Sequence, residues 1–87
     1  MNENQIRLMG VLIKERQHVA IQVQDILTKY GCSIKTRLGM HEATDEQCAP
    51  HGLIILELTG EKSDMEKLEQ ELNDIKSVEA KNITFEL

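Results

Sequence analysis

The sequence predicts an α+β fold of the ferredoxin-like βαββαβ type, a four-stranded antiparallel sheet with two helices on one face. Strand-like and helix-like apolar periods follow one another along the chain in the order β-α-β-β-α-β. A length of 87 residues leaves room for one domain, so residues 1–87 are expected to form a single unit. Right-handed crossovers in this order place the first and third strands at the centre of the sheet.

Residues 5–14 are predicted to form the first strand, because this short segment is rich in Ile, Leu and Val. Apolar residues occupy both faces of it, which indicates a central strand or a second face that meets another subunit. Gly10 is unfavourable within a strand and indicates a bulge or a close approach of another backbone.

Residues 15–30 follow a helical period, and Gly31 is expected to end this helix in a left-handed conformation. The apolar stripe of the helix consists of Val19, Val23, Ile26, Leu27 and Tyr30.

Residues 32–41 alternate between apolar and polar side chains, which predicts a strand with one wet face. On this pattern Ile34 and Leu38 share the dry face, and Cys32 is a small buried residue at its start. The polar segment that follows is expected to be a loop of about ten residues, longer than an ordinary hairpin turn.

The second half of the chain repeats the pattern. Residues 52–60 contain a continuous apolar run that predicts a central strand. Residues 63–76 predict a helix that begins with a capping box of Ser63 and Glu66. Residues 78–87 alternate again and predict the last strand.

The face of the sheet away from the helices is expected to be apolar, because the central strands are apolar on both sides. Monomeric proteins seldom expose so large an apolar patch. The sequence therefore predicts self-association through the sheet, as a homodimer or a homotetramer.

Composition argues against several classes of partner. The net charge is −5, the basic residues form no cluster, and Tyr30 and Phe85 are the only aromatic residues, so direct nucleic acid binding is not expected. No apolar run approaches the roughly 20 residues that span a membrane, and the polar N-terminus does not match a secretory signal. Two cysteines do not form the disulfide framework of a secreted domain, so a cytoplasmic protein is expected.

The segment 40–52 contains the residues best suited to bind a metal. Imidazole and thiolate groups are ligands for nickel and zinc, and the candidate ligands are His41, Cys48 and His51. The alternative is a polar loop with an incidental thiol, because the spacing matches no strict zinc signature.

Catalysis is not expected. Cys48 beside His41 or His51 would resemble a nucleophile with its base, but no third orienting group can be identified. The chain also lacks a glycine-rich phosphate loop. A small thiol enzyme is therefore the last of the alternatives.

Three short motifs and one cysteine carry a resemblance to a known family. They are LMGV at 8–11, RLGMHE at 37–42, Cys48, and GLII at 52–55. On these motifs the chain resembles, over its whole length, the small proteins named as regulators of the iron-only hydrogenase system. These are stand-alone ferredoxin-like domains related to ACT domains and to the regulatory domain of the nickel-responsive repressor.

The resemblance implies an ACT-like dimer or tetramer that senses a small ligand or a metal. In the repressor's regulatory domain, histidines and a cysteine bind nickel at a subunit interface, and His41 and Cys48 are similar in type and rough location. The DNA-binding half of the repressor has no counterpart here, so control of transcription would require another protein as partner. The first hypothesis is a non-catalytic oligomeric sensor, and the alternative is a metal-handling protein that uses the loop 40–52.

Overall fold

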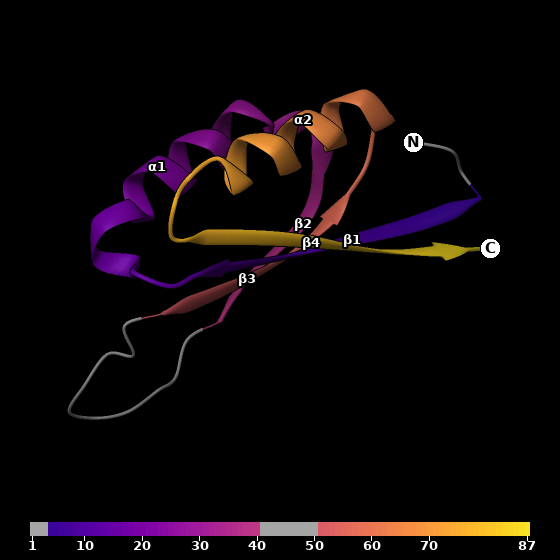
Figure 1. Cartoon of the computed structure of the whole chain (residues 1–87). Coiled ribbons are helices and arrows are strands. Elements are labelled where there is room, and N and C mark those ends of the chain that lie inside the picture. The colour runs from indigo at the N-terminus through magenta and orange to yellow at the C-terminus, as the bar shows by residue number, and fades with distance from the viewer. Residues whose placement is uncertain (1–3, 41–50) are drawn as a thin grey trace.

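The computed structural model describes residues 4–40 and 51–87. Helices α1 and α2 lie side by side over one face of a single sheet (Figure 1), which confirms the ferredoxin-like βαββαβ fold. The elements are β1 (Gln5–Ile13), α1 (Arg16–Lys29), the short 3-10 helix η1 (Gly31–Ser33), β2 (Ile34–Met40), β3 (Gly52–Leu58), α2 (Lys62–Asn73) and β4 (Val78–Glu86). No helix in the described parts of the chain is long and apolar enough to span a membrane.

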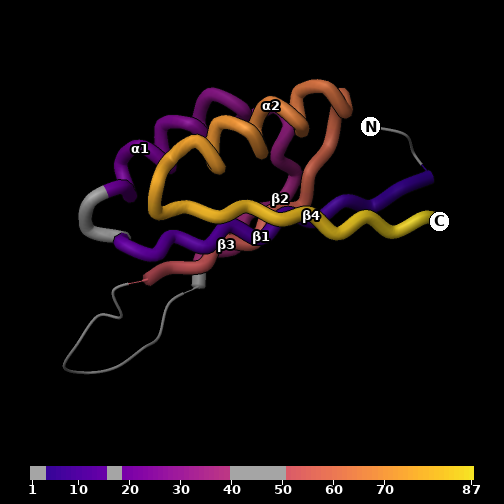
Figure 2. The backbone as a smooth tube through the Cα atoms, viewed as in Figure 1, coloured from indigo at the N-terminus to yellow at the C-terminus, as the bar shows by residue number. Residues whose placement is uncertain are grey.

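The strands are arranged in the order β2-β3-β1-β4, and every neighbouring pair is antiparallel. Strands β1 and β3 are therefore central, as predicted. β1 and β4 continue together beyond the helices to the end at which Asn4 and Leu87 meet (Figure 2). There, the amide of Leu87 donates to the carbonyl of Asn4 at 2.6 Å.

The core lies between the helices and the sheet. The predicted stripe of the first helix is confirmed: Val19, Val23 and Leu27 of α1 are buried, and Ile26 and Tyr30 pack against the core. The buried apolar side chains of the other described elements are Met9, Val11, Ile13, Ile54, Leu56, Leu58, Met65, Leu68, Leu72, Val78 and Ala80. Burying each large side chain of this kind contributes about 1.5–3 kcal/mol, so this layer is the main source of stability.

The end of α1 differs from the prediction. Gly31 is not left-handed, because the chain continues directly into η1, where the amide of Ser33 donates to the carbonyl of Tyr30 at 2.9 Å. Among the described residues only Gly60 has a positive φ, of 87°. The same turn exposes Cys32 and buries Ser33, so the prediction of a buried Cys32 was wrong.

The predicted capping box of α2 was also wrong. The N-cap residue is Glu61, whose carbonyl accepts from the amides of Asp64 and Met65 at 3.1 and 3.2 Å. Ser63 therefore lies inside the first turn, and the side chain of Glu61 makes no capping hydrogen bond.

Strand β2 contains a shift in register between Ile34 and Thr36. Because of this shift, Ile34 lies beside Leu58 on the side of the helices and packs against the core, whereas Leu38 lies beside Ile55 on the opposite side. The predicted common face for Ile34 and Leu38 is thus wrong, since a bulge reverses the alternation of a strand.

Candidate functional site

The end of β1 and the start of β4 are neighbours, because Ile13 pairs with Val78. The turn from β1 to α1 therefore meets the turn from α2 to β4. The amide of Lys14 donates to the carbonyl of Ser77 at 2.7 Å and joins the two turns.

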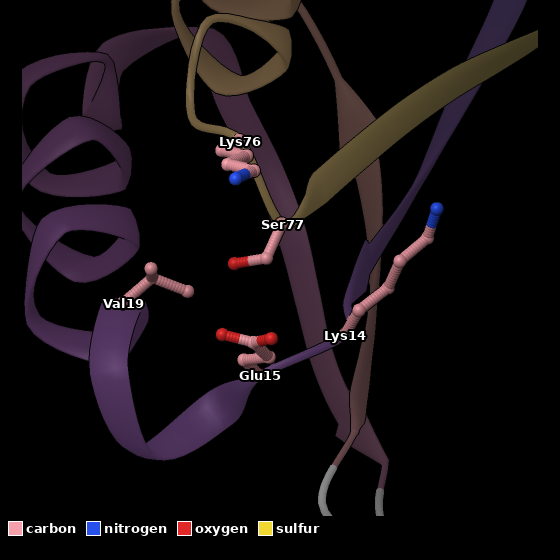
Figure 3. Close-up of a pocket in the computed structure, with 5 residues that line it drawn as sticks. All are labelled: Lys14, Glu15, Val19, Lys76 and Ser77. Carbon is pink, nitrogen blue, oxygen red and sulfur yellow. The ribbon is translucent and has the colours of Figure 1, made fainter.

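A pocket of about 340 Å³ opens between these turns (Figure 3). Its lining residues are Lys14, Glu15, Val19, Lys76 and Ser77. The Glu15 carboxylate, the Ser77 hydroxyl and the Val19 methyl groups point toward a common space, while the Lys14 amine is turned away from them. Val19 is buried and gives the pocket an apolar wall at the start of α1.

The pocket presents polar groups of both charges beside one apolar wall. It combines an ammonium group from Lys76, a carboxylate from Glu15 and a hydroxyl from Ser77, so both donors and acceptors face a ligand. Its volume falls in the range of about 300–1,000 Å³ found for small-molecule sites. The three polar residues are at least partly exposed, so a ligand would stay in contact with water.

The predicted metal ligands are only partly covered by what the structure describes. His51 is exposed and lies directly before β3, whereas His41 and Cys48 lie outside the described residues. Among the described residues, no three His, Cys, Asp or Glu side chains are close enough to hold a metal ion. The metal site at His41, Cys48 and His51 therefore stays a prediction.

The pocket residues were missed by the sequence analysis. Lys14 and Glu15 are separated from Lys76 and Ser77 by most of the chain, and no motif connects them. The available signal was topological: antiparallel pairing of the first and last strands brings the residue after β1 beside the residue before β4.

The second functional feature is the face of the sheet away from the helices, called the outer face here. Pairing partners in an antiparallel sheet point to the same side, so the neighbours of buried Met9 and Leu56 along their strands point outward. Its apolar residues are Ile6, Leu8, Leu12, Leu38, Leu53, Ile55, Ile83 and Phe85. Leu38, Ile83 and Phe85 are 56%, 58% and 52% exposed, so the expected uncovered apolar face exists in this chain.

Comparison with known proteins identifies the fold. No protein-family model matches the chain, and no curated protein matches it. An uncharacterized protein from Thermotoga maritima has a similar structure, with a TM-score of 0.78 and 19% identity over 94% of this chain and 99% of that chain.

Two PII-like proteins are also similar in structure. A protein from Thermus thermophilus assigned to PII-like signalling has a TM-score of 0.67 and 8% identity, over 100% of this chain and 93% of that chain. CPII, a nitrogen regulatory PII-like protein from Thiomonas intermedia bound to ADP, AMP and bicarbonate, has a TM-score of 0.57 and 10% identity, over 95% of this chain and 94% of that chain. At such identities the likeness shows the shared ferredoxin-like fold.

Proposed function

We propose that this protein is a non-catalytic regulatory module that associates with itself through the outer face and responds to a small effector. The observation that supports this function best is the apolar outer face. Three of its large side chains are more than half exposed, on a domain whose core lies entirely on the other side of the sheet. Such a patch is typical of a protein–protein interface.

The effector is proposed to be a small polar molecule that binds in the pocket between Glu15, Lys76 and Ser77. CPII has the same type of fold and binds ADP, AMP and bicarbonate, which supports a small anionic or mixed-charge ligand as the class to test. The resemblance of the motifs at 8–11 and 37–42 supports the iron-only hydrogenase system as the regulated process.

A transition metal is the second candidate effector. Nickel or zinc would be bound by His41, Cys48 and His51, and the exposure of His51 beside β3 supports this candidate. A metal shared between subunits would act as a regulatory signal. A metal enclosed by one chain would instead indicate metal handling.

The proposal is tested by sedimentation velocity at micromolar concentration, with and without ADP, AMP, bicarbonate, nickel or zinc. We expect an assembled species whose distribution shifts with one of these ligands, and calorimetry of the same mixtures assigns the site. Lys76→Glu should abolish binding in the pocket, while Lys67→Glu, an equal charge reversal on the exposed side of α2, should not. Cys48→Ser should abolish only metal binding. A strict monomer that binds none of these ligands would contradict the proposed function.

A further inference from the structure

Gly10 lies in the middle of the central strand β1, where a glycine is unfavourable because it packs no side chain and loses the most backbone entropy. A bulge does not explain it, since the pairing of β1 runs without a shift through Gly10, opposite Ile55 and Lys81. Its φ is not positive either, because only Gly60 has that property among the described residues. The backbone at this position would therefore accept another residue.

A lack of room for a side chain does not explain the glycine either. A Cβ at Gly10 would lie 4.0 Å from the Cδ1 atom of Ile55, the nearest atom among the described residues, which is an ordinary van der Waals contact. The described chain thus has both the conformation and the room for an alanine. Neither the backbone conformation nor the packing of the described residues explains why position 10 is a glycine.

Gly10 points to the outer face, between Leu8 and Leu12 along β1. In the middle of the apolar patch, the backbone of Gly10 is therefore not covered by a side chain of its own. On the adjacent strand, Lys81 is turned toward Glu79, with the Nζ and Oε2 atoms 3.3 Å apart. An apolar side chain from another surface can therefore approach the backbone closely at Gly10.

The apolar patch is large enough to form the centre of a stable interface. It extends about 20 Å from Ile6 to Leu12 and about 14 Å across the four strands before side-chain width is added. Before side-chain width is added, its projected area is about 280 Å², which suits the apolar centre of a standard interface that buries about 800 Å² per partner including its polar rim.

The charges around the patch favour a second copy of the same chain. The whole chain has a net charge of −5, so two copies repel each other at most orientations. The charged groups on and beside the outer face nevertheless form neutral pairs, Glu79 with Lys81 at 3.3 Å and Lys35 with Glu57 at 3.8 Å. Two such faces meet without a net repulsion between them.

We propose that a second copy of this chain packs its outer face against the outer face of the first, with the closest approach at Gly10. The arrangement is isologous, because the same patch serves both copies. It rests on the self-association proposed above and adds the isologous packing of the two outer faces and the point of closest contact.

The test compares Gly10→Val with Gly39→Val by sedimentation velocity over a range of concentrations. Gly39 lies opposite Ile54 on the helix side of the sheet, and a Cβ there would meet nothing within 4 Å among the described residues. We expect Gly10→Val to raise the dissociation constant about tenfold or more, because overpacking an interface is destabilising. Gly39→Val should assemble like the wild type.

A second pair of variants keeps the test decisive if Gly10→Val does not fold. Ile83→Lys changes the outer face and Ile21→Lys changes the exposed side of α1, and these residues are 58% and 78% exposed. Only Ile83→Lys should dissociate the assembly. If the wild type assembles and both Gly10→Val and Ile83→Lys assemble equally well, the outer-face packing is wrong while self-association stands. A monomeric wild type would overturn both.

Discussion

Three side chains join the end of α1 to α2. The Tyr30 hydroxyl and the Lys29 ammonium both donate to the Glu71 carboxylate, and the Lys29 nitrogen lies 3.0 Å from its Oε2 atom. The hydrogen bond from Tyr30, followed by that from Lys29, lowers the pKa of Glu71. The bond to Glu71 raises the pKa of Tyr30 and of Lys29. Each group therefore favours the charge state that the cluster needs near neutral pH.

This cluster predicts a pH-dependent loss of stability in Glu71→Gln. Because the pKa of Glu71 is lowered by folding, its contribution is complete above the ordinary value of 4.5 and is lost as the pH falls through the lower, folded value. Glu71→Gln should therefore have a lower Tm than the wild type at neutral pH, and the difference should shrink below pH 4.5. Thermal unfolding followed by circular dichroism measures it, with Glu66→Gln on the exposed side of α2 as control. An equal difference at every pH would contradict this account.

Single-residue contacts of this kind were beyond the sequence analysis. Tyr30 and Glu71 are separated by 41 positions, and nothing in the periodicity of either helix selects one glutamate of α2 as the partner. The choice depends on how the two helices lie against each other, which is set by the packing of the whole core.

At the scale of elements, the sequence predicted which segments form helices and strands but not how they end. The apolar stripes of α1 and α2 repeat over several helical turns, so the helical period can be recognised even where one residue departs from it. A helix end depends on a few backbone angles. At Glu61 these are set by the chain arriving from β3 after the left-handed Gly60, so the helix begins at Lys62 and the apparent capping box is not used.

The start of α2 can consequently be improved by one substitution. Glu61 is the N-cap residue, with φ −79° and ψ 136°, and its side chain makes no capping bond. Glu61→Asp keeps the charge and shortens the side chain to the length that reaches the amides of the first turn. We expect it to raise the free energy of unfolding by about 1 kcal/mol, measured by urea unfolding. Glu61→Gln, which keeps the length and removes the charge, should give no gain. A gain of equal size in Glu61→Gln would contradict the capping explanation.

At the scale of the whole molecule, the topology could be predicted because it follows from the order of the elements. The apolar outer face could be predicted because apolar residues occupy both faces of β1 and β3. The pocket could not, because Glu15 and Ser77 come together only when the first and last strands pair. The metal prediction rests on His41 and Cys48, which lie outside the described residues.

Association through the outer face also predicts that stability depends on protein concentration. If the folded chain is a dimer and the unfolded chain a monomer, mass action stabilises the dimer by about 1.4 kcal/mol for each tenfold rise in concentration. Shared between two chains of this length, that is about 0.7 kcal/mol per chain, or a rise in Tm of roughly 3–6 °C. Scanning calorimetry of the wild type at several concentrations measures this slope. At concentrations at which Gly10→Val sediments as a monomer, its Tm should not change with concentration, because the monomer is then the folded species. A wild-type Tm that is also independent of concentration would mean that the outer face contributes nothing to folding stability, and that its apolar side chains stay uncovered in solution.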